Sequence, residues 1–367
     1  MHRPFCRLGN CLPVQSIDLA AYQKKLATLQ CMGILSLQTN LKSKWCRYTL
    51  MLSILQNVIM SVTEGYIAYQ FANHMNTFSL SPSEMKSINA LRVYHVLFIT
   101  AQTFQTLFVL DAVAFQNTIS LIAVIIFNVS SFVYGVIQQN QFTALQPLDA
   151  GSEWFASQKV TYSFVFGLAG IFTVLSSICC WKMHKELGWK IYKALGADVA
   201  LKTMYRWYHF FQLLLKVDIF FYLGFSVQFI LLVLVDENST DTGILSYQGK
   251  VQIALHIVVG IITVVGLFVI GSYSAKKENR RLLNVFFIGT IGTIGYFAWK
   301  LSQIMDKTQS TRFQGVQKSL TVFTCACIAL AMSSLAVGGF VKQNFGHGLR
   351  LYLSGKTKNS LDRWNVE

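Results

Sequence analysis

Long apolar stretches separated by short polar segments dominate the chain. Eight stretches hold roughly 20 or more mostly apolar residues, the length that a helix needs to cross the hydrocarbon core of a bilayer. They cover residues 48–70, 90–113, 118–138, 160–181, 210–235, 251–273, 282–301 and 319–341. A backbone surrounded by lipid must satisfy its own hydrogen bonds, so each stretch is expected to be helical. The pattern therefore predicts an all-α, polytopic integral membrane protein with eight transmembrane helices in one bundle.

The polar segments divide the chain into three parts. Residues 1–47 form a basic N-terminal extension, residues 48–341 the transmembrane domain and residues 342–367 a C-terminal tail. Only residues 114–117, without Gly or Pro, separate the second span from the third. Two spans at this point, rather than one long helix, make the total number even and place both termini on the same side.

Composition and charge agree with this interpretation. Hydrophobic residues make up 53% of the chain and charged residues only 13%, about half the charged share of a soluble domain, which excludes a soluble globular enzyme. The net charge of +15 is explained by basic cytosolic loops, without a nucleic-acid partner. Segments 1–47, 182–209, 274–281 and 342–367 hold 22 of the 31 Lys and Arg residues, whereas the loops of the opposite side hold 7. This asymmetry predicts cytosolic termini.

One loop on the predicted lumenal side carries a glycosylation motif. Asn238 is followed by Ser239 and Thr240 in an acidic segment, the arrangement that an N-glycan acceptor requires. Asn238 is therefore a candidate glycosylation site.

Charged residues within the spans are costly in hydrocarbon and are candidates for function. Lys216 and Asp218 lie about two turns into the fifth span, and Asp111 lies near the cytosolic end of the second span at a comparable depth. A structural ion pair between Lys216 and Asp111 is one interpretation. A site for a coupling ion or a proton is the other. Because Lys216 and Asp218 are two residues apart, they face different sides of the helix.

A second polar group is expected near the lumenal side. Glu64 lies in the first span, His95 in the second and His256 in the sixth. A carboxylate near two imidazoles can relay protons or bind a metal ion, and two histidines can ligate a haem. A solvated histidine at the interface is the ordinary alternative, and no metal or cofactor is predicted.

The seventh span contains Gly289, Gly292 and Gly295 at three-residue spacing. Small residues let helix backbones approach closely in lipid, so these glycines are predicted to pack against a neighbouring helix, with the eighth span as the expected partner. A hinge, or the lining of a pathway, is the alternative.

The longest cytosolic connection, residues 182–209, contains a short amphipathic piece. Trp189, Ile191, Tyr192 and Leu195 share one arc, and Lys190 and Lys193 lie on the other. Such a segment can lie among lipid headgroups and attract anionic lipid; a plain basic connector is the alternative. Motifs of metalloproteases (HExxH), serine hydrolases (GxSxG) and P-loop proteins are absent from the sequence, so no enzymatic activity is predicted.

The connection and the fifth span carry a family resemblance. The run GADVALKTMYRWYHFFQLLLKVDIFFYLGF and the first-span piece VTEGYIAYQF resemble an uncharacterised fungal family of multi-pass Golgi apparatus membrane proteins. The resemblance extends from residue 45 to about residue 345. It implies a location in the Golgi membrane and supplies no catalytic residue, because the family has no established activity.

Three classes of function are compatible with these observations. The leading hypothesis is a non-enzymatic Golgi membrane component that acts in trafficking or membrane organisation. A transporter or channel that uses Lys216, Asp218 and Asp111 is the second. A seven-span receptor is the third, and it would require an odd number of spans. Protein partners are not predicted beyond the lipid bilayer itself.

Overall fold

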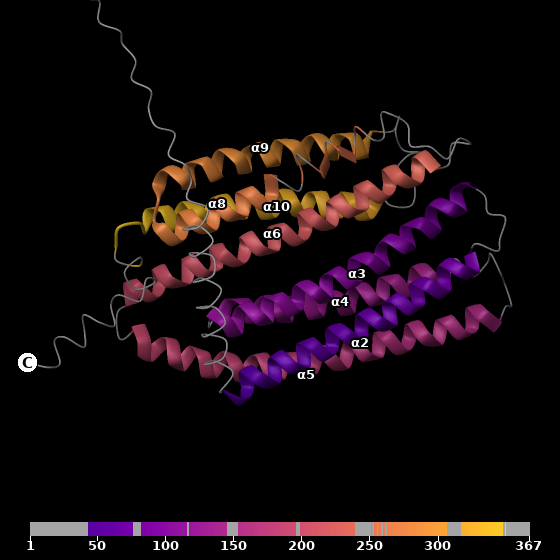
Figure 1. Cartoon of the computed structure of the whole chain (residues 1–367), viewed down its shortest axis with the longest axis horizontal. Coiled ribbons are helices and arrows are strands. Elements are labelled where there is room, and N and C mark those ends of the chain that lie inside the picture. Colours follow the sequence, from indigo (N-terminus) through magenta and orange to yellow (C-terminus); the bar gives the residue numbers. More distant parts are fainter. Residues whose placement is uncertain are drawn as a thin grey trace, which may run out of the picture.

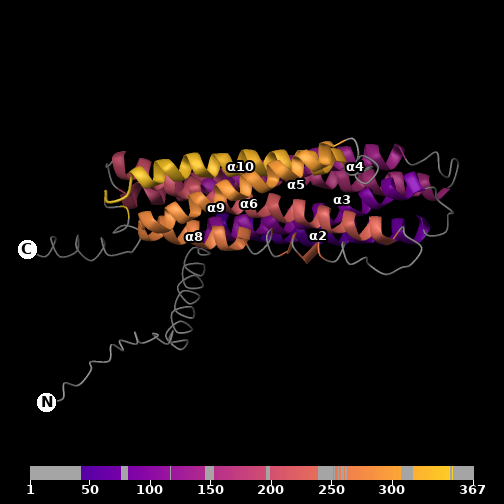
Figure 2. The ribbon, with the colours of Figure 1, turned by 90° about the horizontal axis from the view of Figure 1, so that it is seen from above.

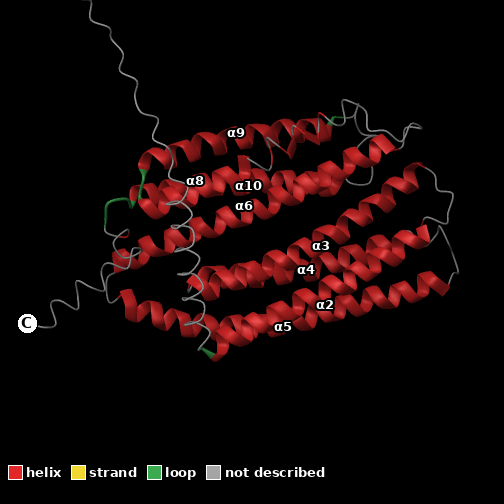
Figure 3. Ribbon diagram, in the orientation of Figure 1, coloured by secondary structure: helices red, strands yellow, loops and turns green. Residues whose placement is uncertain are grey.

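The structure is a computed structural model that describes a helical bundle (Figures 1 and 3). The described residues are 43–75, 82–115, 117–144, 153–195, 199–238, 251–306 except 252, 255, 258, 259, 261 and 262, then 317–347 and 349. The helices are α2 (Lys44–Met75), α3 (Pro82–Phe115), α4 (Thr118–Ala144), α5 (Glu153–Leu195), α6 (Val199–Asn238), α8 (Thr263–Lys277), α9 (Arg280–Met305) and α10 (Gln317–Gln343). Most of the N-terminal extension and of the C-terminal tail lies outside the described residues.

Seven of the described helices are long and apolar enough to cross a membrane: α2, α3, α4, α5, α6, α9 and α10. The protein is thus an all-α, polytopic membrane protein, as predicted. The remaining predicted span, residues 251–273, corresponds to α8 and to the residues before it. At 15 residues, α8 alone is shorter than the hydrocarbon core requires. Before α8, His256, Ile257 and Gly260 are π-helical.

The second and third spans are separate helices, as the sequence predicted. The backbone N–H of Asn117 donates to the carbonyl oxygen of Ala112, which closes the end of α3. The Asn117 side chain then accepts a hydrogen bond from the N–H of Ile119 and so caps the first turn of α4. A capping asparagine therefore turns the chain where neither Gly nor Pro is present.

The prediction that residues 182–209 form a connecting loop was wrong. Helix α5 continues to Leu195 and α6 already begins at Val199, so most of this connection is helical. At 43 residues, α5 is about 65 Å long, roughly twice the thickness of the hydrocarbon core. Leu and Lys are good helix formers and recur between residues 182 and 195, so the helix does not end at the membrane surface.

By their contacts, the described helices form two groups of four, which lie one beside the other in Figure 1. In the first half, α2 packs against α3 and α5, and α4 packs against the same two helices. In the second half, α6 packs against α8 and α10, and α9 packs against the same two helices. The halves share this connectivity, in which the first and last helices of each group close a ring. Contact between the halves is made mainly by α6 with α3 and α4.

The start of α2 and the end of α10 lie at the same end of the bundle (Figure 1). We call this the basal end and the opposite one the distal end. A view from above shows the helices running side by side along one common direction (Figure 2). At the basal end, Glu278 has a left-handed backbone conformation with φ 52°, and Asn279 caps α9 through the N–H groups of Arg281 and Leu282.

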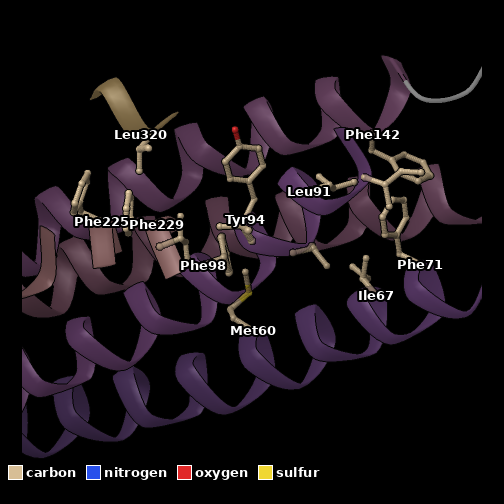
Figure 4. Packing of buried hydrophobic residues seen from close by; sticks show 14 of the residues in the cluster. Met60, Ile67, Phe71, Leu91, Tyr94, Phe98, Phe142, Phe225, Phe229 and Leu320 are labelled. Carbon is tan, nitrogen blue, oxygen red and sulfur yellow. The ribbon is translucent and has the colours of Figure 1, made fainter. Parts of the chain in front are cut away.

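The largest buried cluster joins both halves on the distal side. It includes Met60 of α2, Phe98 of α3, Phe225 of α6 and Leu320 of α10 (Figure 4). The outward faces of the helices are also apolar; Val62, for example, is exposed on α2. An apolar exterior of this extent is what a surface in contact with lipid requires.

Candidate functional site

A large cavity lies between the two halves. Its volume is about 1260 Å³, and residues of α3, α4, α6 and α10 form most of its wall. Ile122 and Ile126 of α4 and Phe210 of α6 line it and are also exposed on the surface of the bundle. The cavity is therefore open sideways, toward the region that lipid covers in a membrane. We call it the inter-half cleft.

One face of α6 runs along the cleft, and its residues change from basic at one end to apolar at the other. The residues on this face are three or four positions apart, as neighbours on one side of a helix are, and all of them line the cleft: Lys202, Arg206, His209, Leu213, Val217 and Phe220. The basal part of the stripe is basic and the part deeper in the bundle is apolar. His184 of α5 and Asn117, which caps α4, also line the cleft at its basal end.

His209 lies where the stripe changes from basic to apolar. Its side chain is only 8% exposed, and its ring packs against Tyr205 at 4.2 Å between centroids. Nε2 of His209 has no hydrogen-bond partner within the described parts of the chain. Buried polar atoms are usually paired, so this nitrogen is a candidate contact for a ligand in the cleft.

Lys216 and Asp111 form an ion pair between the two halves. Nζ of Lys216 on α6 lies 2.5 Å from Oδ1 of Asp111 on α3, with side chains that are 24% and 12% exposed. The second oxygen of Asp111 accepts a hydrogen bond from Ser120 of α4. The pair therefore fastens α6 to the first half, next to the inter-half cleft.

Asp218 points away from this pair and into the second half. It is 6% exposed, and its Oδ2 accepts a hydrogen bond of 2.6 Å from Ser334 of α10. Oδ1 has no hydrogen-bond partner in the part of the chain that the structure describes. Lys216 and Asp218 thus serve different interfaces of α6, as their two-residue spacing indicated.

Glu64 and His95 come together as the sequence suggested. Nδ1 of His95 lies 2.8 Å from Oε1 of Glu64, and Gln138 of α4 donates to the same carboxylate oxygen. Nε2 of His95 lies 3.2 Å from the hydroxyl of Tyr162 on α5. All four side chains are buried. Since both ring nitrogens of His95 have partners in the protein, this histidine is not arranged as an iron ligand.

His256 lies apart from that cluster, in the second half. Its Nδ1 is 2.6 Å from the hydroxyl of Tyr296 on α9, and its ring packs against Phe225 and Phe229 of α6. The expected triad with Glu64 and His95 is therefore not assembled. Within the described ranges, no cluster of three His, Cys, Asp or Glu side chains could hold a metal ion.

A polar network inside the first half was not singled out from the sequence. The side-chain nitrogen of Gln56 on α2 lies within hydrogen-bonding distance of the side-chain oxygens of Gln102 and Gln105 of α3 and of Asn128 of α4, which share its two N–H groups. Its oxygen accepts a hydrogen bond from Ser176 of α5. All are buried. Uncharged amides stand out less than charges in an apolar span. The number of Gln and Asn residues in these spans was the sign from which a polar network could have been predicted. Hydrogen bonds of this kind join helices in lipid.

The three glycines of α9 do not behave alike. A Cβ on Gly289 would collide with Leu267 of α8, so Gly289 marks a close approach, with α8 rather than α10. Among the described residues, nothing lies within 4 Å of a Cβ placed on Gly292 or Gly295, and both positions are exposed. Close packing at these two positions stays a prediction.

Two further candidates fall partly or wholly outside the described residues. Asn238 is the last residue of α6, but its side chain and the two residues after it are not described. In the amphipathic piece, Trp189 is 59% exposed, as an interfacial residue would be, whereas the side chains of residues 190–195 are not described.

The geometry defines a helical membrane protein with a lateral cleft, and the comparisons place it among known proteins. Over 325 residues the chain is 25% identical to the UPF0658 Golgi apparatus membrane protein of Schizosaccharomyces pombe, covering 82% of this chain and 87% of the relative. The resemblance to an uncharacterised family of Golgi membrane proteins is thereby confirmed. No family model matches the chain, and no solved structure matches it.

Proposed function

We propose that this chain is a multi-pass protein of the Golgi apparatus membrane that crosses the bilayer eight times with both termini in the cytosol. The location is supported by the name of the yeast relative, which aligns over most of both chains. An even number of spans is supported by the common basal position of the α2 start and the α10 end (Figure 1). In this proposal, residues 251–277 supply the eighth crossing. The basal end is cytosolic because the described basic segments, 182–195, 199–209 and 274–281, lie there.

Its activity, in this proposal, is non-enzymatic: the protein takes up a membrane lipid in the inter-half cleft and acts in trafficking or membrane organisation. The observation that carries the proposal is the sideways opening of an apolar cleft of about 1260 Å³ within the membrane-spanning part. Pockets for small molecules are typically about 300–1,000 Å³, so this cleft is large enough for the chains of a lipid. In the bilayer, lipids are the abundant molecules with apolar chains that can enter such a cleft.

Photocross-linking tests this proposal. The full-length protein is reconstituted in nanodiscs that contain a phosphatidylcholine with a photoreactive acyl chain, and the labelled peptides are mapped. Labelling is expected on the cleft faces of α4 and α6. Ser130→Phe puts a ring into the cleft, because Ser130 lines it, and should remove most of that labelling. Val129→Phe is the matched control, since Val129 is exposed on the same helix and does not line the cleft. Equal labelling of the cleft in both variants would refute a lipid site.

A second candidate, a transporter or channel, is favoured by one observation. Asp218 is buried in the membrane-spanning part of α6 with one carboxylate oxygen that lacks a partner in the described region, and a membrane-embedded carboxylate is a common ion or proton site. Asp218→Asn keeps the shape of the side chain. It should leave abundance and Golgi targeting intact while abolishing activity in cells. If Asp218→Asn fully complements the null phenotype, Asp218 has no coupling role.

A further inference from the structure

The inter-half cleft is basic at its basal end and apolar deeper in the bundle, which matches the charged head and the apolar tails of one phospholipid. From Lys202 to Phe220 the stripe on α6 rises about 27 Å at 1.5 Å per residue. This is about a third more than the roughly 20 Å of one leaflet with its headgroups, so Lys202 lies at the outer edge of the headgroup layer. Lys202 and Arg206 precede the predicted span, which begins at residue 210, so they lie at headgroup level. The apolar part of the stripe lies at the level of the acyl chains.

The basal mouth of the cleft carries groups that suit a phosphate. Arg206 offers a planar guanidinium that binds phosphate oxygens through two N–H groups, and Lys202 lies one turn before it on the same face. His184 adds a third nitrogen-bearing side chain, and no acidic residue is among the described residues that line the cleft. The charge of this mouth is therefore complementary to an anion.

His209 provides an independent indication of a ligand. Its side chain is more than nine-tenths buried and lines the cleft one turn below Arg206, with Nε2 unpaired in the described region. At this depth a glycerophospholipid presents its phosphate, glycerol and ester oxygens. A rotation of the imidazole that turns Nε2 toward such oxygens would give this buried nitrogen the hydrogen bond that it otherwise lacks.

We propose that the inter-half cleft binds an anionic glycerophospholipid of the cytosolic leaflet. Its phosphate lies at Arg206, Lys202 and His209, and its acyl chains lie against the apolar part of the α6 stripe and against α4. This inference rests on the proposed lipid-binding function and adds the headgroup class and the orientation. Anionic lipids are concentrated in cytoplasmic leaflets, so the ligand is present where the cleft opens.

The experiment compares two photoreactive lipids with identical acyl chains, phosphatidylserine and phosphatidylcholine, in nanodiscs that contain the full-length protein. Phosphatidylserine is expected to label the cleft several-fold more strongly. Lys202→Gln with Arg206→Gln should lower phosphatidylserine labelling by about five-fold for each charge removed. Phosphatidylcholine labelling should fall much less, because that lipid has the phosphate but no net charge. The control Lys182→Gln with Lys185→Gln removes the same charge from exposed residues of α5 that do not line the cleft.

The outcomes distinguish a failure of the anionic headgroup site from a failure of the lipid-binding function. Equal labelling by both lipids in the unmodified protein would leave a lipid site but overturn the anionic headgroup. Equal losses in both double variants would show attraction to the whole basic surface and would also overturn the headgroup site. If neither lipid labels the cleft, the lipid-binding function itself fails. Thermal midpoints measured for every variant separate a loss of binding from a loss of folding.

Discussion

The charged side chains inside the bundle have different partners, and the partners determine what each residue does. Lys216 neutralises Asp111 across the contact between the halves. Asp218, two residues further along α6, faces Ser334 and no cation in the described region. A single helix thus carries a paired charge toward one half and an unpaired carboxyl group toward the other.

The ion pair leads to a testable expectation. An ionised group in hydrocarbon costs roughly 2.5–3.5 kcal/mol on insertion scales. Lys216→Met or Asp111→Leu alone leaves one charge without its partner, so each change should lower thermal stability and steady-state abundance. The double variant removes both charges together and should recover much of the loss, as a double-mutant cycle measured by abundance and melting would reveal.

The same cycle also has a contrary outcome. Losses that add in the double variant would mean that Lys216 and Asp111 contribute independently, and the ion pair would then have no stabilising role. Ser120→Ala is a useful companion variant, because it removes one hydrogen bond from Asp111 and leaves Lys216 in place. It should cost about 1 kcal/mol, less than either charge variant.

Among the helices, α10 shows how little room separates neighbours in the second half. A Cβ added to Gly338 would lie 2.8 Å from Phe287 of α9 and 3.1 Å from Phe211 of α6. Two aromatic rings, one from each neighbouring helix, therefore pack into the space that a side chain at Gly338 would occupy. The next residue, Gly339, has no described heavy atom within 4 Å of a Cβ at its position.

This contrast predicts opposite effects of one methyl group at adjacent positions. Gly338→Ala should destabilise the protein by about 1–3 kcal/mol, the usual cost of overpacking. Gly339→Ala should be neutral or slightly stabilising, because Ala is the better helix former. Melting of both variants in the same detergent measures the difference, and equal midpoints would contradict the close packing of α6, α9 and α10.

At the level of elements, the apolar pattern predicts most helices because a span must be long and apolar. It does not predict where a helix ends outside the membrane. Residues 182–195 are polar enough to read as a connection, yet they continue α5, since helix propensity rather than hydropathy governs there. The turn at Asn117 was predicted through span parity alone, because a capping side chain leaves only a weak local signal.

For the whole molecule, the arrangement in two halves could not be read from the sequence. Residues such as Phe104, Phe127 and Phe220 meet across the halves at 4.9–5.3 Å between centroids, but any apolar span offers many such rings. The pairing of Glu64 with His95 could be anticipated from depth. The isolation of His256 could not, because depth does not indicate which half a span joins.

The topology gives the prediction at this scale. If both termini are cytosolic, a tag at either end should be digested by protease added to sealed Golgi vesicles without detergent. A tag inserted between α4 and α5, after Ala144 and before Glu153, should be protected, because this connection is lumenal in the proposed eight-span arrangement. Protection of one terminus only would indicate an odd number of spans and would refute the eight-span proposal.

The turn at Asn117 also constrains how the protein is made. Helix α3 ends at Phe115 and α4 begins at Thr118, so the chain between them leaves little slack for one helix to enter the bilayer without the other. We therefore expect the two helices to insert together, as one antiparallel hairpin that the hydrogen bond from Ser120 to Asp111 holds closed. Insertion of α3 then depends on α4, and ribosomes stalled before α4 emerges should yield α3 uninserted.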